Sequence, residues 1–458
     1  MDMPINPVWQ HHLFLGGWQS GDGQQMNVTE PATGDVLSQL KSATPADVER
    51  AANIASAAQQ RWMNVPFDQK AEILRKAAAL LKERADEINS WNTRECGSTG
   101  PKAGWELQAT YEQAQMAAAL PMQPSGQIFP SNMPGKRNYW KRIPIGTVGV
   151  IAPWNFPILL SMRSVFPALA MGNCVILKPD PKSAICGGVL MAQILEDAGL
   201  PEGVFHVLPG GPDVGEALVQ HPLVKMISFT GSTAVGKRIG ETCGRMLKKV
   251  ALELGGNNAQ VVLEDAELEI ASSCGAWGSF LHQAQICMQT GRHLVHRSVA
   301  DEYIKRLATR AGNLACGNPW REQVHLGPLI NEAQAQRVED IVNRSVEMGA
   351  RIVVGGKRNG NYYDATVIAD VTPDMPVFSE EVFGPVAPVM AFDSDAEACD
   401  LVNESPYGLA AAIHSGSTER ALKIANQVRV GMVHINDQTV NNEFQVPFGG
   451  MGSSGNSG

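Results

Sequence analysis

Five short runs decide the fold class of this chain: TVGVIAP at residues 147–153, NCVILKP at 173–179, GVFHVLPG at 203–210, VKMISFTG at 224–231 and KVALELGG at 249–256. Each run is rich in apolar residues and ends in proline or glycine, which is typical of a strand that stops at a turn. The segments between them, such as 183–198 and 233–248, have the length of helices. This alternation predicts an α/β fold with a parallel, doubly wound sheet.

The same alternation of strand-like and helix-like segments occurs again further along the chain. After residue 256 we expect strands at AQVVLED (259–265), RHLVH (292–296), RIVVGG (351–356) and PVAPVMAF (385–392), with a helix around 299–313. The sequence therefore predicts a second α/β unit, with a boundary near 254–258. Before the first unit, apolar residues recur at helical spacing within 45–120, which predicts helices there. Residues 125–144 are rich in turn formers and then alternate, which predicts an extended hairpin.

Composition excludes several classes of protein. The 458 residues contain 44% hydrophobic and 18% charged residues, which suits a folded globular chain of two or three domains. The net charge is −9, so the sequence predicts no nucleic-acid partner. The 8 cysteines include no C-x-x-C pair and the N-terminus lacks a basic and apolar leader pattern. We expect reduced thiols and a cytoplasmic location.

One apolar stretch has the length of a membrane span. Residues 143–162, IPIGTVGVIAPWNFPILLSM, carry no charge. They contain Pro144, Pro153 and Pro157, however, and prolines in a lipid-facing helix leave backbone groups unpaired. A buried strand followed by a tight turn is the better interpretation, so no membrane partner is expected.

A glycine pattern follows the fourth run. The segment GSTAVGK at 231–237 lies between a predicted strand and a predicted helix, where backbone N–H groups can bind an anion. It is nearly a P-loop, but Arg238 stands where a P-loop has serine or threonine, which disfavours an NTPase. The pattern alone leaves phosphate binding and an ordinary strand–helix turn both open.

Other candidate residues are equally ambiguous when taken singly. A cysteine such as Cys287 is usually an inert, buried residue, and the histidines near it, His282, His293 and His296, invite a metal interpretation. His293 and His296 lie three apart in a predicted strand and so point to opposite faces, and we expect no metal site. Each of three further residues also has an ordinary structural interpretation. Glu253 could be an exposed carboxylate in a loop, Asn155 could form an Asx turn, and Lys178 could lie in a solvated turn.

Taken together, these segments resemble one family. PWNFP (153–157), LKP (177–179), FTGSTAVG (229–236), LELGG (252–256), Q-x-C (285–287), EEVFGP (380–385) and PFGG (447–450) occur in the order typical of the aldehyde dehydrogenase superfamily. The resemblance runs from about residue 13 to the end. Within the superfamily, HQAQICMQTGRHLVH (282–296) and LKPDP (177–181) are most similar to benzaldehyde dehydrogenases, which oxidise aromatic aldehydes.

The resemblance implies a division of the chain and a set of roles. Residues 1–124 and 145–254 would bind NAD(P), 255–446 would form the catalytic domain, and 125–144 with 447–458 would form a small oligomerisation sheet. Cys287 would be the nucleophile, Glu253 the general base and Asn155 the oxyanion donor. The cofactor would contact Trp154, Lys178, Gly211, Gly231, Ser232, Glu381 and Phe383. The substrate would be flanked by Phe156, Leu160, Arg163, Leu281, Ile286, Met288 and Phe448.

The implied chemistry matches these residue types. A thiolate attacks an aldehyde directly, and fixed N–H donors stabilise the oxyanion that forms. Hydride transfer to a nicotinamide then leaves a thioester, which water activated by Glu253 hydrolyses to the acid. Arg163, the one charge in the substrate set, would either meet a polar ring substituent or form a surface salt bridge.

Three positions depart from the family pattern. Ala284 stands where many members have glycine, beside the catalytic loop. Pro181 occupies the place where NAD-preferring members often carry an acid, with Asp180 adjacent, so NAD is expected and NADP remains the alternative. The sequence ends eight residues after PFGG, at Gly458, where members usually continue to a final strand. We therefore expect a homodimer or homotetramer that the short C-terminus weakens.

Two other functions stay open at this stage. A CoA-acylating dehydrogenase would transfer the acyl group to CoA, but it would not need Glu253 as a hydrolytic base. A catalytically silent relative would keep the fold as a scaffold, although Cys287, Glu253 and Asn155 are all present.

Overall fold

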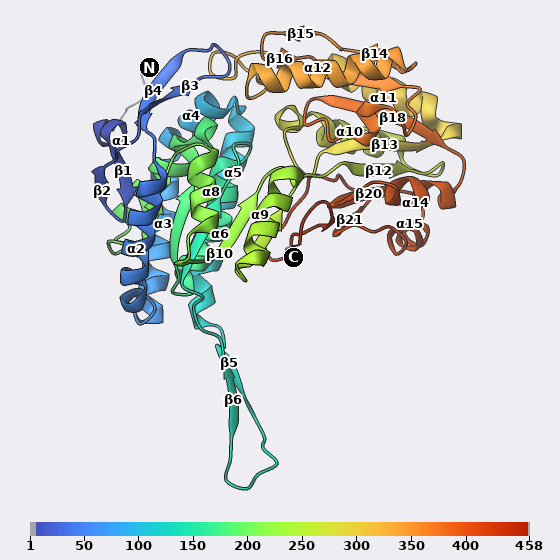
Figure 1. Ribbon diagram of the computed structural model, residues 1–458. Helices are drawn as coiled ribbons and strands as arrows, with labels where there is room; N and C mark the ends of the chain where they lie inside the picture. Colours follow the sequence, from blue (N-terminus) through green and yellow to red (C-terminus); the bar gives the residue numbers. More distant parts are fainter. Residues whose placement is uncertain (1–5, 457–458) are drawn as a thin grey trace.

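The computed structural model describes residues 6–456. Two α/β units lie side by side, and a long two-stranded hairpin projects from the first (Figure 1). The first unit contains the N-terminal half of the chain, from blue to green, and the second contains the yellow-to-red half. The predicted α/β class is confirmed by this arrangement of two seven-stranded sheets.

The first sheet carries the five runs that decided the fold. Its strand order is β11-β10-β7-β8-β9-β1-β2, in which β11 to β9 are parallel and β1 and β2 antiparallel. The chain moves from β7 to β8 and β9 on one side, then returns to β10 on the other side of β7. The strand order therefore reverses between β7 and β10, and such switch points form binding crevices at the carboxyl ends of the strands. The strands are β1 (His12–Leu15), β2 (Trp18–Ser20), β7 (Thr147–Ile151), β8 (Cys174–Lys178), β9 (Phe205–Val207), β10 (Val224–Thr230) and β11 (Lys249–Glu253).

Helices surround this sheet, and the predicted helical region 45–120 is confirmed. Thr44 begins it with a capping box, because its side chain and that of Asp47 each accept the other's backbone N–H. Gly97, at φ 68°, turns the chain between α4 and α5. The helices are α1 (Pro7–His11), α2 (Pro45–Trp62), α3 (Phe67–Glu83), α4 (Ala85–Cys96), α5 (Gly100–Ala119), α6 (Pro157–Ala170), α7 (Leu190–Asp197), α8 (Pro212–Gln220) and α9 (Thr233–Arg245).

One predicted helix is irregular at its start. Residues 183–198 contain a π-helical turn over Ile185–Val189 before α7 begins. The Glu95 carboxylate accepts the backbone N–H groups of Ile185 and Cys186, at 2.8 Å each. A side chain at Gly187 would place its Cβ 2.8 Å from Cβ of Pro157. Tertiary contacts that the local sequence does not contain therefore fix this turn.

The second sheet begins directly after the first ends, because β11 stops at Glu253 and β12 starts at Asn258. Its order is β14-β17-β18-β13-β12-β20-β21, parallel except for β14. Its strands are β12 (Asn258–Val262), β13 (Thr290–His296), β14 (Arg351–Val354), β17 (Thr366–Ala369), β18 (Val386–Phe392), β20 (Ala410–His414) and β21 (Met432–Ile435). Its helices are α10 (Leu268–Phe280), α11 (Ala300–Gly312), α12 (Glu332–Glu347), α13 (Pro376–Ser379), α14 (Asp395–Asn403) and α15 (Thr418–Ala425).

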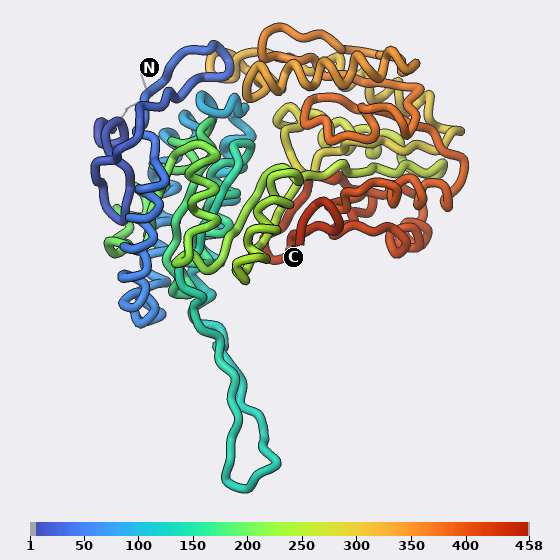
Figure 2. Tube along the Cα trace, viewed as in Figure 1, coloured from blue at the N-terminus to red at the C-terminus, as the bar shows by residue number. Residues whose placement is uncertain are grey.

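The predicted hairpin at 125–144 is confirmed. Strands β5 (Gly126–Phe129) and β6 (Asn138–Lys141) form a two-stranded antiparallel sheet and extend away from the body of the molecule (Figures 1 and 2). Its apolar side chains face solvent, with Ile128 at 74% and Tyr139 at 79% exposure. Three further two-stranded sheets pair β3 (Gln25–Thr29) with β4 (Val36–Lys41), β15 (Arg358–Asn359) with β16 (Tyr362–Tyr363), and β19 (Tyr407–Gly408) with β22 (Met451–Gly452).

The C-terminal segment lies apart from that hairpin within the single chain, and the predicted oligomerisation role of 125–144 and 447–458 stays a prediction. As far as Asn456, the last described residue, the segment packs at the junction of the two sheets. Ser454 Oγ donates to the backbone oxygen of Gly255 at 2.7 Å, and Asn456 Oδ1 accepts the backbone N–H of Leu252 at 2.9 Å. These bonds hold the segment beside β11, because it satisfies backbone groups of that edge strand.

The uncharged stretch 143–162 forms β7, a turn and the start of α6, in agreement with the predicted strand and turn. Within residues 6–456, the structure contains no helix with the length and apolar character needed to cross a membrane.

Candidate active site

Cys287 lies in a strained loop between α10 and β13. His282, Gln283 and Ala284 have φ values of 48°, 56° and 52°, a left-handed conformation that is unfavourable for residues other than glycine. Three side-chain hydrogen bonds tie the loop to Pro328 and Asn258, which lie outside it. Gln283 Nε2 donates to the Pro328 oxygen at 2.7 Å, and Asn258 Nδ2 donates to the backbone oxygens of Cys287 at 2.8 Å and Gln289 at 2.7 Å. The surrounding structure therefore imposes a conformation that the loop sequence would not adopt alone.

Asn155 reaches this loop from the first unit. It lies in the turn between β7 and α6, and its Nδ2 donates to the backbone oxygen of Gln285 at 2.8 Å. Asn155 and Cys287 line the same cavity. The structure therefore brings together two predicted residues that are far apart in sequence. The Asn155 side chain is buried, unlike that of a solvated Asx turn.

The Cys287 thiol is strongly disfavoured from ionising. Its pKa is raised to about 12, mainly by burial and then by the negative charge of Glu253, while the positive charge of Arg163 acts in the opposite direction. The pKa of Arg163 is itself lowered by burial and raised by Cys287 and Glu253. The three groups thus form one electrostatic cluster, in which Arg163 favours the thiolate.

Arg163 is not in a surface salt bridge. Its guanidinium carbon lies 4.3 Å from the centroid of the Phe448 ring, a cation–π contact inside the cavity. Within residues 6–456 the structure contains no ion pair between Arg163 and a carboxylate. Of the two alternatives for Arg163, contact with a polar ring substituent of the substrate therefore fits its position better than a surface salt bridge.

Glu253 ends β11 and is half-buried, in contrast to an exposed loop carboxylate. Its backbone oxygen accepts the N–H of Gly231 at 3.0 Å, which ties the two glycine-rich turns together. The negative charge of its side chain raises the pKa of the Cys287 thiol and that of the Arg163 guanidinium.

The cavity beside Cys287 has a volume of about 900 Å³. All seven residues predicted to flank the substrate line it: Phe156, Leu160, Arg163, Leu281, Ile286, Met288 and Phe448. Sequence reasoning missed several other lining residues, among them Trp105, Leu159, Trp277, Val440 and Asn441. Trp105 and Trp277 lie on helices whose local sequence contains no functional motif, so no signal could have found them.

The predicted cofactor residues gather at the carboxyl ends of β7, β8 and β10. Trp154 follows β7, Lys178 ends β8, and Gly231 with Ser232 follows β10. Ser232 is the N-cap of α9 and Gly211 that of α8, so two helix N-termini begin at this edge. Free N–H groups at such termini bind anions.

Two further predicted residues approach from the second unit. The ring of Phe383 packs edge-on against that of Trp154 at 5.7 Å. Glu381 Oε1 accepts the N–H of Gly256 at 2.9 Å, and burial raises the Glu381 pKa to about 7. A Cβ at Gly255 would stand only 2.4 Å from Glu381 Oε2, so a larger residue there would displace this carboxylate. Together these residues supply an ammonium, a carboxylate, a hydroxyl and two helix N-termini. This set of hydrogen-bonding groups fits a ligand that contains phosphate and sugar.

Asp180 is already engaged. Its Oδ1 accepts the backbone N–H of Lys182 at 2.9 Å and caps a short 3₁₀ turn that begins at Pro181. The residue next to the position of the family acid therefore has a local structural role.

The histidines near Cys287 have other contacts. The His293 ring nitrogens bond with Ser279 Oγ at 2.7 Å and the Tyr303 hydroxyl at 2.8 Å. His282 packs edge-on against Phe156 at 5.5 Å. Among residues 6–456 there is no cluster of three side chains suited to a metal ion.

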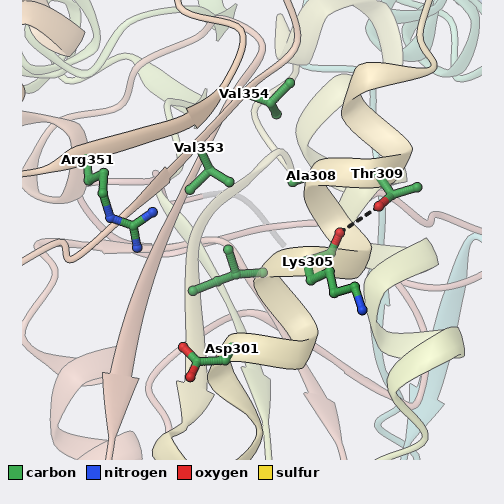
Figure 3. A pocket seen from close by; sticks show the side chains of 8 residues that line it. Asp301, Lys305, Ala308, Thr309, Arg351, Val353 and Val354 are labelled. Carbon is green, nitrogen blue, oxygen red and sulfur yellow. Dashed lines mark hydrogen bonds between the residues drawn. The ribbon is translucent and has the colours of Figure 1, made fainter.

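A second concavity of about 540 Å³ lies between α11 and β14 (Figure 3). Asp301, Lys305, Arg351 and Val353 line it, and none of the predicted site residues does. The cavity at Cys287 is therefore the candidate active site.

Comparisons with known proteins identify the family of the chain. Residues 18–458 match the model of the aldehyde dehydrogenase family. The chain is 56% identical over 452 residues to benzaldehyde dehydrogenase [NAD(+)] of Pseudomonas putida, covering 99% of this chain and 93% of the relative. It is 50% identical to a vanillin dehydrogenase of Amycolatopsis, covering 98% and 92%.

Solved structures are similar as well. A salicylaldehyde dehydrogenase from Pseudomonas putida G7, complexed with salicylaldehyde, superposes with a TM-score of 0.95 at 31% identity, covering 97% of this chain and 93% of that one. Lactaldehyde dehydrogenase from Escherichia coli superposes with a TM-score of 0.94 at 34% identity, covering 97% and 94%. The chain therefore belongs to the aldehyde dehydrogenase family.

Proposed function

We propose that this protein oxidises aromatic aldehydes to carboxylic acids with NAD as the electron acceptor. The observation that carries the proposal is the juxtaposition of Cys287 and Asn155 on a cavity lined by aromatic and aliphatic side chains. A thiol beside a fixed amide donor suits addition to a carbonyl group. The names of the benzaldehyde and vanillin dehydrogenases to which the chain is similar support the same substrate class.

In this proposal Cys287 is the nucleophile. Its thiolate adds to the carbonyl carbon, and the resulting oxyanion is bonded by the Asn155 amide and the backbone N–H of Cys287. The bond from Asn155 Nδ2 to Gln285 uses one of its two hydrogens, and the other is the donor that we assign to the oxyanion. Burial keeps the thiol protonated, and the positive charge of Arg163 partly offsets this effect because it favours the thiolate.

When bound, NAD supplies the hydride acceptor that converts the thiohemiacetal into a thioester on Cys287. Glu253 then takes a proton from a water molecule, which adds to the thioester carbonyl. Collapse of the tetrahedral intermediate breaks the carbon–sulfur bond, and the acid leaves while the thiolate is restored. The half-buried position of Glu253 at the end of β11 suits a base that must meet both water and the acyl group.

The cofactor would occupy the switch-point edge of the first sheet. We assign Lys178 and Glu381 to the ribose hydroxyls, and Gly231, Ser232 and the start of α9 to the phosphates. Gly211 lies at the start of α8 on the same edge, and Trp154 with Phe383 flanks the approach to Cys287. NADP is the alternative cofactor, because Asp180 is engaged locally and Pro181 carries no acid.

We extend the proposal to the whole molecule. Residues 1–124 and 145–254 would form the NAD-binding domain and 255–446 the catalytic domain. The hairpin at 125–144 would join copies of the chain into a homo-oligomer, which its exposed apolar side chains support. The 8 free thiols support a reducing, cytoplasmic location.

A spectrophotometric assay tests the proposed reaction. NADH formation would be followed with benzaldehyde, vanillin, hexanal, acetaldehyde and no substrate, each with NAD and with NADP. We expect a kcat/KM for benzaldehyde at least about tenfold above that for acetaldehyde, since an apolar pocket gains about 0.8 kcal/mol per buried CH₂. A higher kcat/KM for acetaldehyde would contradict the aromatic assignment, and no NADH with any aldehyde would contradict the activity.

A further inference from the structure

Helix α6, which follows the Asn155 turn, is capped by a different helix. Its own N-cap residue, Phe156, provides no capping side chain, although the first N–H groups of a helix need acceptors. Oε1 of Glu106, on α5, accepts the backbone N–H groups of Ile158 at 2.8 Å and Leu159 at 3.1 Å. A carboxylate at this end also complements the helix dipole. The start of α6 is thereby fixed to α5.

The other oxygen of Glu106 binds a buried ammonium. Lys102 Nζ lies 2.6 Å from Glu106 Oε2 and also donates to Ser98 Oγ at 3.0 Å. Asn92 Nδ2 donates to the same Glu106 oxygen at 2.7 Å, and Ser98 Oγ donates to Asn92 Oδ1 at 2.7 Å. Lys102 is 2% exposed and Glu106 0% exposed, so water does not compete for these bonds.

A further bond of Lys102 connects this pair to the site. Its Nζ donates to the backbone oxygen of Asn155 at 2.8 Å. On its other side, the Asn155 amide donates to the backbone oxygen of Gln285, in the cysteine loop. The Asn155 residue is thus held at its backbone by α5 and at its side chain by the loop that carries Cys287. Lys102 Nζ also lies 4.3 Å from the Phe156 ring centroid, which faces the same cavity.

We infer that Lys102 and Glu106 are positioning residues, whose buried ion pair holds the Asn155 amide in the direction of the substrate oxyanion. The inference rests on the proposed function and names residues that act through Asn155 without touching the reacting atoms. An amide that must donate within about 3 Å of a developing oxyanion is sensitive to small shifts of its backbone. The ammonium on the Asn155 oxygen and the carboxylate on the next helical turn fix that backbone.

A buried ion pair can also serve stability alone, and the chain offers a matched control. Glu95, on the neighbouring helix α4, is likewise a buried carboxylate that accepts two backbone N–H groups, those of Ile185 and Cys186. Its bonds go to the π-helical turn before α7. Glu95→Gln should therefore remove a similar capping carboxylate without disturbing Asn155.

A double-mutant cycle in the full chain separates the two roles. Asn155→Ala should lower kcat about 100-fold, and Lys102→Met and Glu106→Gln about 10- to 100-fold. Because these residues act through Asn155, Lys102→Met should cause no further loss in the Asn155→Ala background. The Kd for NAD should stay within about twofold, and Glu95→Gln should keep kcat within about threefold. Ser98→Ala, which removes one bond to Lys102, provides a milder member of the cycle if Lys102→Met does not fold.

Three results would overturn the inference in a wild-type protein that oxidises benzaldehyde. In the first, the losses in kcat multiply in the double variant. In the second, Lys102→Met, Glu106→Gln and Ser98→Ala all keep the wild-type kcat. In the third, Glu95→Gln lowers kcat as much as Glu106→Gln does. A wild-type protein that oxidises no aldehyde would instead overturn the proposed function itself.

Discussion

At the scale of single residues, the site is organised by the charge balance around one thiol. Cys287 is half-buried, and the negative Glu253 and the positive Arg163 act on its pKa in opposite directions. Arg163 has the Phe448 ring as its neighbour, so its charge is not neutralised by a fixed ion pair within residues 6–456. The reactivity of the thiol should therefore respond with opposite signs to the loss of each neighbour.

The first prediction concerns alkylation of the cofactor-free protein by iodoacetamide. A Cys287 pKa of about 12 means that the thiolate fraction keeps rising through the accessible range. We expect the rate to increase about tenfold per pH unit between about pH 7 and pH 10, without the plateau of an ordinary thiol near pH 9. Arg163→Gln should raise the pKa and slow alkylation about tenfold, and Glu253→Gln should lower the pKa and speed it.

The measurement is the rate of label incorporation, with Cys287→Ser as the background from the other cysteines. A plateau below about pH 9, or the same direction of change in both variants, would show that this charge balance does not control the thiol.

The second prediction concerns Glu253 in turnover. In Glu253→Gln the thiolate can still add to the aldehyde, but water is no longer activated to hydrolyse the thioester. We expect a burst of about one NADH per active site, followed by turnover slowed about 100-fold or more, measured by stopped-flow absorbance. Cys287→Ala is the matched control, since it should give no burst while still binding NAD. Unchanged steady-state turnover would remove Glu253 from the role of base.

At the scale of elements, the cysteine loop is the least local part of the fold. His282, Gln283 and Ala284 are left-handed. The loop is held by a bond from Gln283 Nε2 to the Pro328 oxygen and by a bond from Asn258 Nδ2 to the Cys287 oxygen. Ala284 is completely buried at φ 52°. Alanine therefore adopts here a left-handed conformation that the glycine of many family members would adopt without strain. The added methyl group is accommodated in the core, and the backbone remains left-handed.

The third prediction is the outcome of Ala284→Gly. Glycine would relieve about 1–2 kcal/mol of left-handed strain. Against this, it would add about 0.4–1 kcal/mol of unfolded-state entropy and lose about 0.8 kcal/mol of methyl burial. These contributions nearly cancel, so we expect the free energy of unfolding to change by less than about 1 kcal/mol. Urea denaturation measures it, and a stabilisation above about 2 kcal/mol would mean that the strain at Ala284 is larger than its φ implies.

At the scale of the whole molecule, the hairpin is the feature that a single chain leaves unexplained. It projects beyond the body of the protein (Figure 1), with Ile128, Tyr139 and Ile143 at 74%, 79% and 75% exposure. Exposed apolar strands of this kind are typical of surfaces that a partner covers. A second copy of the chain is the occupant that we propose.

The fourth prediction tests that surface. Ile128→Lys combined with Tyr139→Lys adds charge to an already basic hairpin and removes about 1.5–3 kcal/mol of apolar burial per side chain in an assembly. We expect sedimentation velocity to show a shift toward monomer with little change in the melting temperature of the chain. Met348→Lys, at a side chain 45% exposed near the end of α12, is the control for added charge. An unchanged oligomer would exclude the hairpin as the contact.

Much of the fold was predictable because its signals are local. The runs at 147–153 and 173–179 became β7 and β8, and the region 45–120 became α2 to α5, since burial and turn residues are written along each segment. The residues of the PWNFP, LELGG and Q-x-C segments were also identifiable, because each motif occupies adjacent positions. The contacts of the C-terminal segment at β11 could not be predicted, because they involve residues about 200 positions earlier in the chain.

The succession of strands and helices, the family and the chemical types of the candidate residues could be read from the chain before it was folded. Three features came only from the folded molecule: Trp105 and Trp277 line the cavity, Arg163 lies over Phe448 within it, and Glu106 caps α6 from another helix. The physical reason is that these contacts join side chains from separate elements. Their partners are selected by close packing of the whole core, which no short stretch of sequence encodes.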